Sequence, residues 1–130
     1  MDTTRKQIFI GALLHDIGKF YQRSDASFSD KYNNLSDYSK RMAEDLCPIN
    51  DNGRFGYQHV IWTNEFIETF GKTFELVPGL SQNLIGKSDA ENSLASFASN
   101  HHRPKTMMQA FVTMADWWSA GIDRTDPKTF

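Results

Sequence analysis

The stretch GALLHDIGKFYQR, residues 11–23, carries the most informative pattern in the chain. His15 and Asp16 stand side by side after an apolar run, and Gly18 and Lys19 follow them. A His-Asp pair alone occurs by chance in roughly one chain in ten of this length. The pair has two interpretations. In one, His15 caps a helix end and Asp16 pairs with Lys19. In the other, the glycine permits close backbone approach beside a metal site.

Length and composition favour one globular domain over residues 1–130. The chain has 130 residues, of which 39% are hydrophobic and 23% charged, which excludes a disordered or collagen-like chain. No apolar run reaches the roughly 18 residues that a membrane span needs, so we expect no membrane partner. The N-terminal apolar patch lacks a signal-peptide cleavage site. Cys47 is the single cysteine, which excludes an internal disulfide and a thiolate metal cage and favours the cytoplasm.

The charge balance limits how the protein can bind nucleic acid. The chain has 14 lysine and arginine residues against 16 acidic residues, a net charge of −2. This balance excludes the strong non-specific electrostatic binding to nucleic acid that histones show. An enzyme that contacts a phosphodiester locally remains compatible with this balance, because metal ions can supply the positive charge.

Apolar periodicity and capping residues predict an all-α fold of about five to six helices with long loops, and strand signals are weak. In the first half we expect a helix that is capped by Asp2 or Thr3, runs to about residues 18–21 and turns Ile8, Ala12 and Leu13 toward the core. We then expect a loop over 23–34, a helix capped by Ser36 and ended by Pro48, and a turn at 51–53. In the second half we expect a helix from 56 to a stop at Gly71, an irregular segment over 72–87, a helix opened by a Ser88–Glu91 capping box, and a last helix from Pro104 to Gly121.

All four histidines fall in three groups that could form one site. His59 opens a predicted helix, His101 and His102 follow another, and His15 precedes Asp16. Asp116 lies within the last predicted helix among apolar and aromatic residues, where a buried carboxylate needs a cation. Trp117 and Trp118 beside it are expected in the core.

Imidazole and carboxylate ligands suit divalent Mn, Fe, Co, Ni or Zn. Neighbouring helix residues point about 100° apart, so two adjacent ligands cannot easily bind one ion from the same face. A carboxylate at Asp16 that bridges two ions, with His101 and His102 each serving a different ion, would satisfy both pairs. The sequence therefore favours more than one ion. Taken singly, each group has a structural alternative: His59 as an ordinary helix histidine, Asp116 paired with Arg103 or Arg124, and His101–His102 at the surface. Four coincidental histidines are the less probable interpretation.

Taken in order, these strings resemble the HD superfamily of metal-dependent phosphohydrolases. HDIGK resembles its signature, but no histidine stands upstream of His15, so the ligand order is circularly permuted. That order resembles the N-terminal HD nuclease domain of the large signature subunit of type III, Csm-type, CRISPR effector complexes. The matching strings are GALLHDIGKFYQR, NHHRP, ADWWSAGIDR and the middle histidine at His59.

The resemblance implies a helical domain that cuts single-stranded DNA with a divalent metal, most often Mn, Ni or Co, in the cytoplasm of a prokaryote. It also implies a longer parent chain that assembles with other effector subunits, guide RNA and target RNA. None of the palm-domain motifs of such a parent occur here, so we expect the N-terminal fragment and assign it no cyclase activity.

We therefore expect one or two ions held by His15, Asp16, His59, His101, His102 and Asp116, with Asp16 bridging. His15, Asp16 and Lys19 form the expected catalytic group. Lys19 and Arg103 are expected to bind substrate phosphates, with salt bridges as their structural alternative. Asp123 and Arg124 are expected to form a structural pair. Phe20 and Tyr21 could stack on bases or pack in the core.

Two other functions stay open from the sequence. The same chemistry could act on nucleotides or cyclic dinucleotides, although the permuted ligand order favours the nuclease. A degenerate, non-catalytic HD fold could serve as a scaffold, although a scaffold has no need of six metal-seeking groups.

Overall fold

The computed structural model describes residues 2–24, 35, 37–53, 55–80, 84–86 and 91–123. The predicted all-α fold is confirmed: within these ranges the chain forms helices and no named strand, apart from an isolated bridge between Ile49 and Phe55. The elements are α1 (Thr3–Leu14), α2 (Gly18–Ser24), α4 (Asp37–Leu46), α5 (His59–Phe74), α6 (Leu94–Ser99), the 3-10 turn η1 (Asn100–His102) and α7 (Met107–Asp123).

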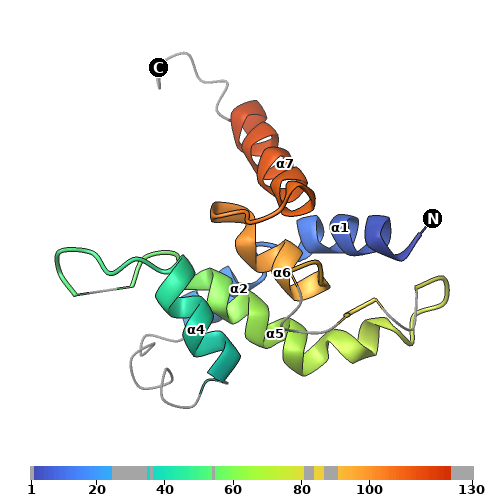
Figure 1. Ribbon diagram of the computed structural model, residues 1–130, viewed down its shortest axis with the longest axis horizontal. Coiled ribbons are helices and arrows are strands. Elements are labelled where there is room, and N and C mark those ends of the chain that lie inside the picture. Colours follow the sequence, from blue (N-terminus) through green and yellow to red (C-terminus); the bar gives the residue numbers. More distant parts are fainter. Residues whose placement is uncertain are drawn as a thin grey trace.

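Helices α5 and α6 form the centre of the molecule (Figure 1). α2 and α4 pack on α5, while α6 packs on α5, α1 and α7. α7 contacts the body through α1, α6 and η1, and its far half projects beyond them (Figure 1). This arrangement brings the end of α1, the start of α5, η1 and the side of α7 to one region.

The single helix expected over residues 3–21 is two helices. Asp2 caps α1, with its carboxylate accepting a hydrogen bond from the Arg5 N–H at 2.9 Å, as the sequence predicts. The α-helix ends at Leu14, and a turn over residues 15–17 leads into α2. At this bend the Thr63 hydroxyl of α5 accepts from the Gly18 N–H and donates to the His15 carbonyl, two groups that a continuous helix would pair internally. Helix α2 also approaches α5 closely. A Cβ built at Gly18 would lie 1.9 Å from the His59 carbonyl oxygen.

Three other helix limits differ from expectation. α5 continues past Gly71, whose missing side chain makes room for Ile85 rather than ending the helix: an added Cβ would lie 2.5 Å from Ile85 Cδ1. α7 likewise runs through Gly121 to Asp123, and it begins at Met107 rather than near Pro104. By contrast, α4 ends before Pro48 as predicted, and the expected turn is present, with the Gly53 N–H donating to the Asn50 carbonyl at 2.9 Å.

The capping box that opens α6 lies five residues later than predicted. Ser93 accepts a hydrogen bond from the Ser96 N–H, and the Ser96 hydroxyl in turn accepts from the Ser93 N–H. Serine can fill the third position of such a box, so the preference for Glu or Gln there misplaced the prediction. Ser88, Ser36, Arg124 and residues 25–34 lie outside the described residues.

The core has two parts, one on each side of α5. Between α4 and α5 the buried residues are Leu35, Met42, Ala43, Leu46, Cys47, Val60, Ile61 and Trp62. Between α5 and α6 they are Ile67, Leu84, Leu94, Ala95 and Ala98, with Ile10 of α1 packed against them. α5 thus contributes buried side chains to both parts.

Several apolar residues expected inside are exposed. Leu13 is 80% exposed, Trp117 67% and Trp118 69%, so the prediction of core positions for these three was wrong. Both tryptophans belong to the second half of α7 (Met107–Asp123), the half that projects beyond α1, α6 and η1 in Figure 1.

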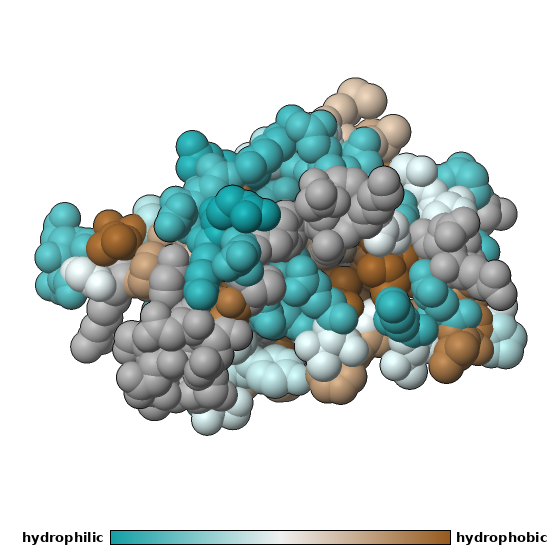
Figure 2. Space-filling model, turned by 60° about the horizontal axis from the view of Figure 1, so that its bottom comes forward, coloured by the Kyte–Doolittle hydropathy of each residue, from teal (hydrophilic) through white to brown (hydrophobic). Residues whose placement is uncertain are grey.

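The surface mixes polar and apolar side chains. On the face shown in Figure 2, brown apolar residues form separate small patches among teal polar ones. Within the described ranges, the helices all fall short of the length and apolar character that crossing a bilayer requires.

Candidate metal centre

The turn after α1, helix α5, the 3-10 turn η1 and helix α7 bring the six predicted ligands together. His15 follows α1 as its C-cap and Asp16 lies in the next turn. His59 is the first residue of α5. η1 supplies His101 and His102, and α7 supplies Asp116. The structure therefore brings together side chains that are up to 101 residues apart in the chain, as in the contact of His15 with Asp116.

The three histidines of α5 and η1 direct their Nε2 atoms at one another. The His59 Nε2 lies 3.4 Å from the His101 Nε2 and 3.1 Å from the His102 Nε2. Two imidazole nitrogens bound to one tetrahedral ion, each about 2 Å from it, would lie about 3.3 Å apart. The spacing of this histidine triad therefore already suits a shared cation, and its ligand atoms all lie within 4.8 Å of one another.

Backbone carbonyls fix the tautomers of two histidines. The His15 Nδ1 lies 2.6 Å from the Ala12 carbonyl oxygen, and the His101 Nδ1 lies 2.7 Å from the Ala98 carbonyl oxygen. A carbonyl oxygen can only accept, so both Nδ1 atoms carry the proton. In the neutral ring of His101 the Nε2 lone pair then points into the cluster, and in both histidines the carbonyl fixes the ring orientation as in many metal-binding histidines.

The carboxylates complete a second group of ligands beside the histidine triad. Asp16 directs Oδ1 at His59 Nε2, 3.6 Å away, and Oδ2 at His15 Nε2, 3.5 Å away. His15, Asp16 and His101 also place ligand atoms within 4.8 Å of one another. Asp116 Oδ1 lies 3.1 Å from His15 Nε2. The two oxygens of Asp16 thus face different imidazoles: Oδ1 faces His59 and His101, and Oδ2 faces His15.

Burial favours the neutral form, which binds metals, in His59, His101 and His102. Desolvation, strengthened by the neighbouring His102, lowers the pKa of His59 to about 4 and the pKa of His101 to about 3. Desolvation also lowers the pKa of His102, against the opposing effect of Asp116 and Asp16. For Asp16, burial alone would raise the pKa, but the Lys19 hydrogen bond and the nearby His15 bring it below its usual value.

Two buried threonines, which sequence reasoning missed, hold the turns that carry the ligands. The Thr63 hydroxyl donates to the His15 carbonyl at 3.0 Å and accepts from the Gly18 N–H at 3.1 Å. The Thr113 hydroxyl donates to the His101 carbonyl at 2.8 Å. Each threonine shares a helix with one ligand and binds the backbone of another. Thr63 stands four residues after His59 and so lies on the same face of α5. This spacing is the one sequence feature that could have placed Thr63 near the site.

The two cations assigned to substrate phosphates both form ion pairs in the structure. Lys19 Nζ lies 2.6 Å from Asp16 Oδ2 at the edge of the cluster. Arg103 Nη1 lies 3.6 Å from Asp45 Oδ1 and donates to the Asp45 carbonyl at 2.7 Å, and Lys105 pairs with the same carboxylate. Both arrangements match the structural alternatives that the sequence left open, and Arg103 is directed away from the cluster toward α4.

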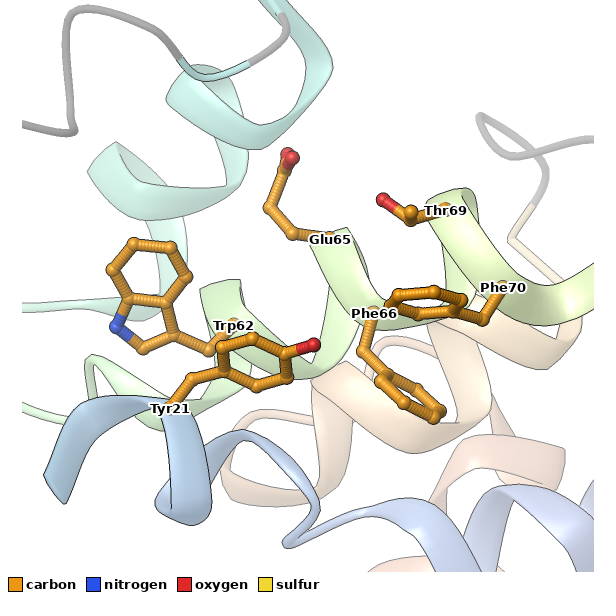
Figure 3. Close-up of a pocket in the computed structure, with 6 residues that line it drawn as sticks. All are labelled: Tyr21, Trp62, Glu65, Phe66, Thr69 and Phe70. Carbon is orange, nitrogen blue, oxygen red and sulfur yellow. The ribbon is translucent and has the colours of Figure 1, made fainter. Parts of the chain in front are cut away.

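An aromatic pocket of about 260 Å³ lies along α5, lined by none of the histidines. Tyr21 of α2 lines it and lies 6.3 Å from Trp62, ring centre to ring centre, while Phe20 is exposed. Figure 3 shows the rings of Tyr21, Trp62, Phe66 and Phe70 along one side of the helix. Tyr21 therefore packs against α5 rather than beside the metal ligands.

The cluster of histidines and aspartates can hold a metal ion. The Nε2 atoms of His59, His101 and His102 lie at separations suited to shared coordination, and the carboxylates supply the compensating negative charge. Comparison with protein-family models, with curated proteins and with solved structures finds no match to this chain.

Proposed function

We propose that the protein is a metal-dependent phosphodiesterase that cuts single-stranded DNA. In this proposal it is the permuted HD nuclease domain of a type III CRISPR large subunit, working with the other effector subunits and their guide and target RNA in a prokaryotic cytoplasm. The observation that carries the proposal is the position of Asp16. Its Oδ1 faces His59 and His101 while its Oδ2 faces His15, the arrangement expected of a carboxylate that bridges two ions.

The residues present fit divalent Mn, Ni or Co. The donor set combines four imidazoles and two carboxylates without a thiolate, because the single cysteine, Cys47, lies in the core. His59, His101 and His102 would hold one ion, and His15 and Asp116 a second, with Asp16 between them. When bound, such ions supply Lewis acidity, lowering the pKa of a water and neutralising phosphate charge.

The chain's own residues orient and balance this chemistry. The carbonyls of Ala12 and Ala98 keep the rings of His15 and His101 turned inward. Lys19 is half exposed at the edge of the cluster, where its ammonium group can turn from Asp16 to a phosphate oxygen of the substrate. The near-neutral surface charge leaves substrate attraction to this local site, so we expect weak affinity for DNA at physiological salt.

The experiment compares the wild-type protein with Asp16→Asn and with the matched control Asp51→Asn in an exposed turn. Each purified protein is analysed for bound metal and incubated with Mn²⁺ and single-stranded DNA, double-stranded DNA, single-stranded RNA, nucleoside triphosphates or cyclic dinucleotides. We expect Asp16→Asn to keep its helical circular dichroism while losing at least about 100-fold in cleavage of single-stranded DNA, since even an outer partner of a metal ligand costs 10–100-fold. Asp51→Asn should match the wild type.

Each other result identifies a different function. Cleavage restricted to triphosphates or cyclic dinucleotides would replace the nuclease with a nucleotide phosphohydrolase. A protein that binds no divalent metal and cleaves no substrate would be a non-catalytic scaffold. Equal cleavage by Asp16→Asn and wild type would remove this cluster from the reaction.

A further inference from the structure

Tyr57 has a backbone conformation that its side chain disfavours. Its φ is 51°, and it is the one non-glycine residue with positive φ in the part of the chain that the structure describes. For a bulky side chain this conformation is unfavourable and persists only when the surrounding structure imposes it. Such residues concentrate at functional sites, so the position of the Tyr57 ring is informative.

The loop between α4 and α5 imposes the conformation. The Tyr57 carbonyl oxygen accepts hydrogen bonds from the Val60 N–H at 3.0 Å and from the buried thiol of Cys47 at 3.5 Å. The neighbouring Gly56 N–H donates to the Pro48 carbonyl at 2.8 Å, which closes the loop beneath the tyrosine. Hydrogen bonds therefore join the two ends of this loop, Cys47 and Pro48 at one end and Gly56 and Tyr57 at the other.

The conformation places the phenol ring against the metal cluster. Its centre lies 4.2 Å from the His102 ring centre with 26° between the planes, and 6.4 Å from the His59 ring centre. The side chain nevertheless stays 51% exposed, so burial in the core does not account for its position. One face of the ring is covered by an imidazole of the cluster while much of the side chain remains open to solvent.

We propose that Tyr57 is a stacking platform for a nucleobase of the substrate, one that sets a base next to the phosphate held at the histidine cluster. The inference rests on the proposed function. An exposed aromatic ring accepts the face of any base, and such stacking strengthens binding about tenfold or more per base without sequence preference. A single-stranded substrate offers unstacked bases to this ring, whereas a duplex does not.

The experiment distinguishes binding of the base from binding of the phosphate. The substrates are a short single-stranded oligothymidylate and an abasic oligomer of the same length, each in a cleavable and a phosphorothioate-linked form. KM and kcat are measured with Mn²⁺ on the first form, and affinity is measured by fluorescence anisotropy on the second. Metal affinity is measured by calorimetry in the absence of DNA.

Three variants of Tyr57 are compared. Tyr57→Leu removes the ring, Tyr57→Gly removes it while suiting the positive φ and so protecting the fold, and Tyr57→Phe keeps the ring. Phe70→Leu removes a comparably exposed ring elsewhere, 45% exposed.

We expect Tyr57→Leu and Tyr57→Gly to bind oligothymidylate about tenfold more weakly and to raise KM by a similar factor, as loss of one stacked base implies. Their affinity for the abasic oligomer and for Mn²⁺ should equal that of the wild type. Tyr57→Phe and Phe70→Leu should behave as wild type on both oligomers.

Three results would overturn the inference. If the wild type cleaves both oligomers and Tyr57→Gly weakens neither selectively, Tyr57 does not bind the base, and the nuclease assignment stands. If Tyr57→Gly weakens Mn²⁺ binding and both substrates alike, Tyr57 only positions His102. If the wild type neither binds nor cleaves single-stranded DNA with Mn²⁺, the proposed function fails and the inference fails with it.

Discussion

At the scale of single residues, Thr63 shows how one hydroxyl can hold a ligand-bearing turn. It is fully buried and joins the His15 carbonyl to the Gly18 N–H. We expect Thr63→Val to lower the free energy of unfolding by about 1–3 kcal/mol, because two buried backbone groups lose their partner. We also expect Mn²⁺ affinity to fall about tenfold, because the turn that presents His15 and Asp16 loosens.

Urea denaturation and calorimetric Mn²⁺ titration measure the two effects. Thr63→Ser keeps the hydroxyl and should restore Mn²⁺ affinity. Thr69→Val makes the same substitution at an exposed position of α5 and should change neither quantity. A Thr63→Val protein that binds Mn²⁺ as tightly as the wild type would show that the turn is held by other contacts.

The residues of the site divide into those that the sequence identifies and those that it does not. His15, His59 and Asp116 are predictable because imidazole and carboxylate groups are recognisable wherever they stand. Thr63 and Tyr57 are not, because a threonine hydroxyl and a tyrosine ring acquire their roles only through partners about 45 residues away in the chain.

At the scale of helices, the contact between α2 and α5 is set by one missing side chain. A Cβ at Gly18 would lie 1.9 Å from the His59 carbonyl oxygen and 2.6 Å from the Thr63 nitrogen, both backbone atoms that cannot turn aside. We expect Gly18→Ala to destabilise the fold by about 3 kcal/mol, because α2 must move away from α5.

Gly121→Ala is the matched control, since a Cβ there meets nothing within 4 Å and α7 gains a better helix former. It should raise stability by about 0.5–1 kcal/mol. Thermal unfolding of both variants compares them directly. Equal melting temperatures for the two would contradict the close approach of α2 to α5.

Helices were predictable where local signals act alone. Asp2 caps α1, and α4 ends before Pro48, because a carboxylate acceptor and a missing N–H act within one turn of chain. Glycines misled the prediction at residues 71 and 121, since a glycine that packs closely and a glycine that ends a helix are identical in sequence. The break at residues 15–17 likewise depends on α5, which the local sequence does not contain.

At the scale of the whole molecule, the neutral histidine cluster makes the metal-free fold sensitive to acid. His59, with a pKa of about 4, and His101, with a pKa of about 3, stay neutral in the fold, whereas in the unfolded chain each binds a proton below about pH 6.5. The unfolded state therefore binds more protons in acid, so the free energy of unfolding falls as the pH drops from 6.5 toward 3. The lowered pKa of Asp16 acts in the same direction.

Urea denaturation in the presence of a chelator should show a loss of about 2 kcal/mol or more between pH 7 and pH 4. His101→Gln removes one of the strongly depressed groups and should flatten this dependence. A free energy of unfolding that stays constant over that interval would mean that the imidazoles are not desolvated.

The overall fold class follows from helical periodicity, but the shape of the molecule does not. Trp117 and Trp118 have the apolar spacing of core residues, yet α7 carries them beyond the body, where they meet solvent (Figure 1). Periodicity reports that a helix has an apolar face, whereas the partner of that face is determined by the positions of the other helices.

The ligands are spread along the chain from His15 to Asp116, and this has a mechanical consequence. A cation that joins them would act as a removable cross-link, closing loops of tens of residues much as a disulfide does. Chelators would then loosen the joint between α1, α5 and α7 even where no substrate is turned over, so metal supply would govern the lifetime of the protein as well as its chemistry.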